Sequence, residues 1–191
     1  MTATSVPTPL PPAPAMAAVA RCLVTTLGLL VARRVHLPTE NQGLRLDFAD
    51  GTSARVFRET VIDRPVSRDP CLLVVTFELR GVHGRGHAWF RRASVLNTLL
   101  FAGFPGLSSK LWLTHDEHGA YRGLYEWDGP GAAQAYARAL YRVLALVSVP
   151  GSIGYRVVPG LRRRDLRTWM DRRDPGATPW WQLTAMRPAR S

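Results

Sequence analysis

The chain has 191 residues, of which 46% are hydrophobic, so it can form one domain with a core and extensions. Its formal net charge of +11 comes almost entirely from arginine, because Lys110 is the only lysine. That charge permits contact with nucleic acid or an anionic membrane, but the absence of an RNP motif, zinc-finger spacing or heptad array argues against nucleic acid. Two cysteines are too few for a disulfide framework, so we expect a protein of the reducing cytoplasm.

The N-terminal part divides into a proline-rich leader and an apolar segment. Residues 1–15 contain several prolines among small residues, which predicts either a disordered leader or a true start of translation at Met16. Residues 16–35 are helical in character, but their apolar run from Cys22 to Ala32 is too short to cross a bilayer of ~30 Å. Two interpretations stay open: a helix packed on the domain, or a membrane-surface helix with Arg33 and Arg34 at the headgroups.

A β-hairpin is predicted next, because two strand-like runs at 44–48 and 53–61 flank Asp50-Gly51, a strong turn signal. We place the helix and this hairpin together in an N-terminal extension, residues 16–70. The near-continuous apolar run at 71–79 is typical of a central strand. A glycine-rich loop at 81–87 and a helical pattern at 88–102 follow it.

A second hairpin, with strands at 107–113 and 121–127, lies near the middle of the chain. A helix is predicted from Pro130 and a last strand at 153–158. The order over residues 71–160 is therefore strand, helix, strand, strand, helix, strand. This order predicts an α+β fold: a ferredoxin-like βαββαβ antiparallel sheet with two helices on one face.

The C-terminal segment, residues 161–191, predicts a basic amphipathic helix over 161–174 followed by a loose tail. The tail contains Trp180-Trp181. Because paired tryptophans are costly to expose, we expect them to dock back on the domain.

The second hairpin carries the first candidate site. Side chains alternate across a strand, and we expect a register that sets Lys110 opposite Glu126 and Trp112 opposite Leu124. Such a charge pair either stabilises the sheet by only ~0.2–1 kcal/mol or lines a pocket in which Glu126 is a base and Lys110 an oxyanion or carboxylate partner. Trp112 and Tyr125 would form stacking walls for a flat ligand, with Phe104 in the same aromatic group.

Other candidates are histidines in loops. His87, next to the glycine-rich loop, could act as an acid or base near neutral pH, although a plain connecting loop explains it as well. The polar loop at 114–120 contains two histidines and two acids, but adjacent ligands on a hairpin tip rarely converge on one ion. We therefore predict a solvated turn there and no metal site.

The segments 103–113 and 121–136, GFPGLSSKLWL and YRGLYEWDGPGAAQAY, resemble the YdhR-like monooxygenase family of the dimeric α/β-barrel superfamily. The matching pattern is a Ser-Lys-Leu-Trp strand, an aromatic-x-Gly-aliphatic-Tyr strand and a helix with Ala-x-x-Tyr. Arg122 stands where the family more often has glycine, which would alter the pocket. The resemblance covers roughly residues 71–160 and implies a homodimer formed through sheet contact.

Three functional hypotheses follow. The first is a small-molecule enzyme without a cofactor: a monooxygenase, isomerase or cyclase acting on a flat aromatic or polyketide-like substrate. The second is a non-catalytic dimeric module that binds a small molecule in the same pocket. The third is a peripheral membrane or scaffold protein that acts through its terminal helices.

Overall fold

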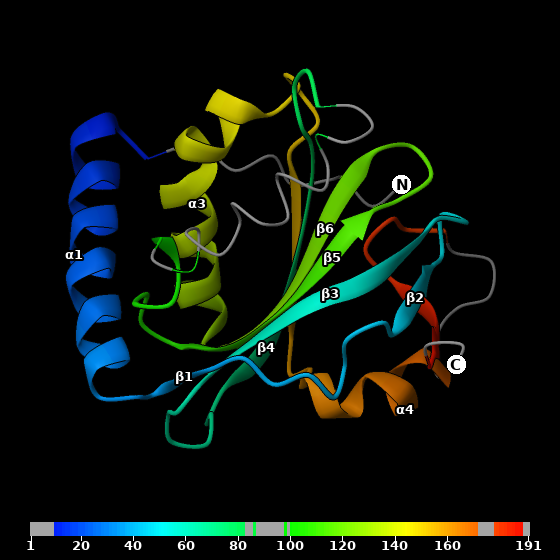
Figure 1. The fold of residues 1–191 in the computed structure, drawn as a ribbon, viewed down its shortest axis with the longest axis horizontal. Coiled ribbons are helices and arrows are strands. Elements are labelled where there is room, and N and C mark those ends of the chain that lie inside the picture. The colour runs from blue at the N-terminus through cyan, green and yellow to red at the C-terminus, as the bar shows by residue number, and fades with distance from the viewer. Residues whose placement is uncertain (1–9, 83–85, 87–97, 99, 172–177, 189–191) are drawn as a thin grey trace.

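The computed structural model describes residues 10–82, 86, 98, 100–171 and 178–188. Most described elements are strands of one antiparallel sheet, with α-helices beside it (Figure 1). In chain order the elements are α1 (Pro12–Val31), β1 (Val35–His36), β2 (Arg45–Phe48), β3 (Ser53–Ile62), β4 (Pro70–Glu78), β5 (Leu107–His115), β6 (Ala120–Asp128), α3 (Pro130–Val147), β7 (Gly154–Pro159), the 3-10 helix η2 (Arg163–Asp165), α4 (Leu166–Asp171) and β8 (Leu183–Arg187).

The order of strands in the sheet confirms the ferredoxin-like prediction. The order is β7-β4-β6-β5-β3-β2-β8, and β1 also pairs with β3. The first four of these strands run antiparallel to their neighbours, with the first strand of the unit, β4, between its last two, β7 and β6. This is the arrangement expected when α3 crosses one face to connect β6 to β7. The predicted helix at 88–102 falls largely outside the described residues.

The central strand β4 is buried on both faces, as its continuous apolar sequence predicts. Leu73 and Val75 face a core shared with α1 and α3. Leu72 and Val74 face a second core, shared with β2, β8 and α4. Figure 1 shows α1 and α3 together on one side of the sheet, and α4 with β2 on the other.

Helix α1 is packed on the domain along one stripe. Cys22 and Thr26 are almost fully buried, and both lie against Gly103. A Cβ atom on Gly103 would lie 2.1 Å from the Cys22 carbonyl oxygen, so only glycine allows this close approach. The interpretation of this segment as a packed helix therefore holds for one of its faces.

The opposite face of α1 is apolar and exposed. Val24, Leu27 and Val31 are 72%, 56% and 86% exposed, and Arg33 and Arg34 follow directly. By length and composition α1 could cross a membrane, a test that packed helices also pass. Contact with a membrane surface stays a prediction.

Both ends of the chain differ from expectation. Helix α1 begins at Pro12, inside the predicted disordered leader, because proline in a first helical turn loses no hydrogen bond. The predicted loose tail contains β8, which pairs with β2 along Arg45–Phe48. The basic C-terminal helix begins later than predicted, at Leu166, and Trp181 does dock, packing beside Trp169 with ring centroids 5.9 Å apart.

These C-terminal elements bear on the predicted homodimer. That prediction rested on the resemblance and on the largely apolar sheet, and in the structure β2, β8 and α4 cover the sheet face that α1 and α3 leave free. A second copy would find no bare sheet face at β4 on which to stack. The homodimer through sheet contact stays a prediction.

Candidate active site

The pairing of β5 with β6 decides which side chains meet. Lys110 lies opposite Tyr125 and Trp112 lies opposite Gly123, with irregularities in the pairing before Ser109 and after Trp112. The predicted register, with Lys110 opposite Glu126, is wrong by one residue. Because side chains alternate, Glu126 is on the other face of the sheet, where it accepts a hydrogen bond of 3.0 Å from the Arg163 backbone nitrogen. Lys110 and Glu126 do not form a pair.

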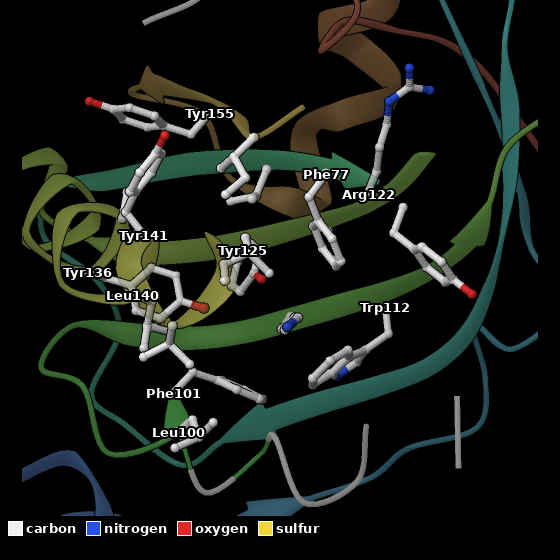
Figure 2. Close-up of a pocket in the computed structure, with 18 of the residues that line it drawn as sticks. Phe77, Leu100, Phe101, Trp112, Arg122, Tyr125, Tyr136, Leu140, Tyr141 and Tyr155 are labelled. Carbon is white, nitrogen blue, oxygen red and sulfur yellow. The ribbon is translucent and has the colours of Figure 1, made fainter. Parts of the chain in front are cut away.

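A cavity of about 250 Å³ lies between the sheet and α3. Its walls are mainly aromatic and aliphatic, and they come from β3, β4, β5, β6, β7 and α3 (Figure 2). Ligand pockets for drug-sized molecules are usually larger, roughly 300–1,000 Å³, so this cavity suits a small ligand. Phe101, Trp112, Tyr125, Tyr136, Leu140 and Tyr155 are among the lining residues.

Lys110 reaches this cavity from β5 and is 6% exposed. Its Nζ lies 3.1 Å from the ring centroid of Trp112, 4.4 Å from that of Phe101 and 4.5 Å from that of Tyr125. Within the described residues, its nitrogen has neither a hydrogen bond nor an ion pair. The amine is thus enclosed by ring faces instead of carboxylates.

This environment acts on the Lys110 amine in two opposite ways. Burial, and secondarily the positive charge of Arg58, hold the pKa of the amine well below its ordinary value of 10.5. The surrounding rings favour the charged amine through cation–π attraction, but this is worth only ~0.5–2 kcal/mol. Since desolvation of a buried charge costs several kcal/mol, the net effect is a lowered pKa of the Lys110 amine.

Trp112 is held in place from two sides. Its Nε1 donates a hydrogen bond of 3.1 Å to Thr60 Oγ1 on the neighbouring strand β3. The Arg58 guanidinium lies 4.0 Å from the Trp112 ring, and burial lowers the pKa of Arg58 to about 10. The Trp112 ring therefore has two basic side chains close to it, and of these the Arg58 guanidinium makes the local potential positive.

Tyr125 and Tyr136 are the hydroxyl-bearing neighbours of the amine. Their rings are 5.5 Å apart and their hydroxyls share a hydrogen bond. Burial raises the pKa of Tyr125 to about 12 and that of Tyr136 well above 10, so both are neutral proton donors near pH 7. Gly123 makes room for this arrangement, because a Cβ there would lie 2.8 Å from the Tyr125 ring.

Of the other candidate site residues that the structure describes, one borders the cavity and the rest do not line it. Arg122 borders the cavity, but its guanidinium points away (Figure 2) to Asp50 at 2.6 Å and Asp116 at 3.4 Å. Leu124 packs in the core on the opposite face of the sheet. Phe104 packs edge-to-face on Tyr136, 5.1 Å between centroids, behind the cavity wall. His87 lies outside the described residues.

The loop at 114–120 is a turn held by side-chain hydrogen bonds. Asp116 Oδ1 accepts backbone hydrogen bonds from His118 and Ala120, at 2.9 and 3.0 Å. Glu117 accepts hydrogen bonds from Ser53, which lower its pKa to about 2. No three His, Cys, Asp or Glu side chains among the described residues are placed to hold a metal ion.

Sequence reasoning did not assign Arg58, Phe101 or Tyr136 to the site. Tyr136 lies on the apolar stripe of α3 and is also part of the hydrophobic core. Arg58 had one signal: it is a charged residue in the middle of a run that is otherwise typical of a strand. Phe101 lies near the end of the predicted helix at 88–102 and was not assigned to a site.

We predict that Lys110→Met stabilises the protein, because it removes a buried amine without changing the volume greatly. The gain should be ~1–3 kcal/mol at neutral or lower pH. Lysine in the unfolded chain has a pKa of ~10.4, above the pKa of Lys110 in the folded protein. Between these two pKa values the stability of the wild type rises with pH, so the gain from methionine shrinks. Urea unfolding of both proteins between pH 6 and ~10.4 measures this. A gain independent of pH, or a loss of stability with methionine, would contradict the assignment.

A comparison with solved structures found matches at low similarity. One is a major regulator of staphylococcal pathogenesis, 14% identical, with a TM-score of 0.40 over 58% of this chain and 69% of that one. A monooxygenase-like protein from Listeria innocua is 15% identical, with a TM-score of 0.41 over 59% and 67%. An uncharacterized ferredoxin fold protein related to antibiotic biosynthesis monooxygenases, from Listeria monocytogenes, is 14% identical, with a TM-score of 0.43 over 72% and 88%.

No family model matches the chain, and no curated protein is similar to it. The resemblance to the YdhR-like family therefore stays a prediction. The fold class rests on the order of the strands in the sheet. The chain is a ferredoxin-like α+β protein with a small, aromatic, lysine-bearing cavity between its sheet and α3.

Proposed function

We propose that the chain binds a small, flat, electron-rich molecule in this cavity and acts on it without a cofactor, as a monooxygenase, isomerase or cyclase. The observation that carries the proposal is the position of Lys110. It is a buried amine at the wall of an aromatic cavity, enclosed by the rings of Trp112, Phe101 and Tyr125. Unsatisfied buried amines cost stability, so their retention favours a functional role.

The chemistry of such a site follows from its charges. A phenol or enol in the cavity would meet Lys110 and the positive potential from Arg58, which favour its deprotonated form. The neutral Lys110 amine can accept the proton, and the protonated amine then faces the oxyanion. An electron-rich anion formed in this way can isomerise, cyclise or react with dioxygen, which would be the second substrate of an oxygenation.

The alternative is a non-catalytic binding module with the same cavity. It predicts the same ligand affinity but no consumption of the ligand. The YdhR-like resemblance places Lys110 and Trp112 in the family's Ser-Lys-Leu-Trp strand, which fits either function. Cytoplasmic localisation is part of this proposal.

The ligand prediction is tested with 1-naphthol, a flat phenol of suitable size. Calorimetry should detect its binding to the wild-type chain, and Lys110→Met should weaken it by tenfold or more, about 1.4 kcal/mol. Ser109→Ala is the matched control, because Ser109 is also buried on β5, is adjacent to Lys110 and does not line the cavity. Equal affinities for the wild type and Lys110→Met would refute the role of the amine. Loss of 1-naphthol in air-saturated buffer would distinguish the enzyme from the binding module.

A second candidate function is contact with an anionic membrane surface through α1. The observation that favours it is the exposed apolar face of Val24, Leu27 and Val31 beside the exposed Arg33 and Arg34. An amphipathic helix at the headgroup level combines these two features.

This membrane contact should be visible in vesicle flotation. We expect binding to vesicles that contain phosphatidylserine, weakened at least severalfold by Val24→Ser with Leu27→Ser and by high salt. Binding to neutral vesicles alone, or retention by the double variant, would contradict it. Cys22 and Thr26 face the domain, so the double variant should keep its melting temperature.

A further inference from the structure

We propose that Lys110 is a covalent site: its amine condenses with the carbonyl carbon of a small flat aldehyde or ketone held in the aromatic cavity, and an imine results. This inference rests on the proposed ligand-binding function and names the substrate class. It assigns to the amine the role of nucleophile, which the proton transfer described above does not require.

The first support is the chemical state of the amine. Only an unprotonated amine attacks a carbonyl, and burial favours that form. A carboxylate neighbour would restore the charge, but no ion pair to Lys110 occurs within the described part of the chain. Buried lysines with this property are the ones that form Schiff bases.

The second support is the position of the nitrogen. Nζ lies 3.1 Å from the Trp112 ring centroid, with Phe101 and Tyr125 further round it, and it lines the same cavity as these rings. A flat carbonyl compound that stacks on the cavity walls would bring its carbonyl carbon to the amine. The rings would also favour the protonated imine by the same cation–π attraction that they offer to the ammonium.

The third support is a proton source beside the amine. The condensation forms a C–N bond while the carbonyl π electrons move to oxygen. The nitrogen loses its two hydrogens, and the oxygen leaves as water with two protons. Tyr125 is neutral and hydrogen bonds to Tyr136, so its hydroxyl can protonate that oxygen and be reprotonated. The small apolar cavity then limits the water that would reverse the reaction.

The test uses 1-naphthaldehyde with sodium cyanoborohydride, which donates a hydride to the imine and makes the adduct permanent. Apart from the N-terminal amine, Lys110 is the only primary amine of the chain, so intact mass and peptide mapping locate the adduct without ambiguity. We expect one adduct on Lys110, formed at neutral pH at least about tenfold faster than on N-acetyl-lysine, since each unit of pKa lowering raises the free-amine fraction about tenfold. An excess of 1-naphthol should slow this reaction.

Two variants isolate the cause. Lys110→Arg keeps a long basic side chain but cannot form the imine, and it should lose the adduct while the N-terminal background persists. Ser109→Ala should react as the wild type does. Wild-type labelling no faster than that of N-acetyl-lysine, or not slowed by 1-naphthol, would overturn the proposal.

The two proposals fail in different ways. If 1-naphthol binds but 1-naphthaldehyde leaves no adduct on Lys110, the covalent inference is wrong and the binding function stands. If neither molecule enters the cavity, the proposed function is wrong as well.

Discussion

The register of β5 on β6 is the constraint on which the candidate site depends. The pairs Lys110 with Tyr125 and Trp112 with Gly123 place the side chains of Lys110, Trp112 and Tyr125 on the same face of the sheet. Gly123 has no side chain there, which leaves space for the Tyr125 ring. A shift by one residue would turn Lys110 and Trp112 into the core of Leu111 and Leu124. The aromatic cavity, the buried amine and the space for the Tyr125 ring all follow from this pairing.

The two faces of the sheet are used differently. One face meets α1 and α3 across aromatic side chains, and a cavity remains between them. The other is closed by β2, β8 and α4 over a core rich in leucine. Elements from both ends of the chain thus cover a face that a bare ferredoxin-like sheet would expose, and they leave the cavity on the helical side as the main internal space near Lys110.

Much of the fold could be predicted because its signals are local. The apolar run of β4, the Asp50-Gly51 turn and the helix start at Pro130 each have a direct physical reading. The register could not be predicted, because the irregularities before Ser109 and after Trp112 shift the pairing without a sequence signal. Strand β8 was missed for a related reason: its stability comes from pairing with β2, far away in the chain.

The candidate site was predicted in part, and the successful part had a clear cause. A single lysine in an apolar strand beside a tryptophan is unusual, and it did lead to the cavity together with Trp112 and Tyr125. Glu126 was wrong as its partner because strand parity alone cannot choose between two registers. Arg58 and Tyr136 come from β3 and α3, and only the tertiary fold brings them beside Lys110.

The central claim is that Lys110 is a buried amine whose charged form is disfavoured. Since the chain has one lysine, protein labelled with [13Cε]lysine should give one lysine signal in carbon NMR, and its titration reports this amine alone. Our account predicts a midpoint well below 10.5, with the unfolded chain in urea titrating near the ordinary value. A folded-state midpoint at or above 10.5 would contradict it.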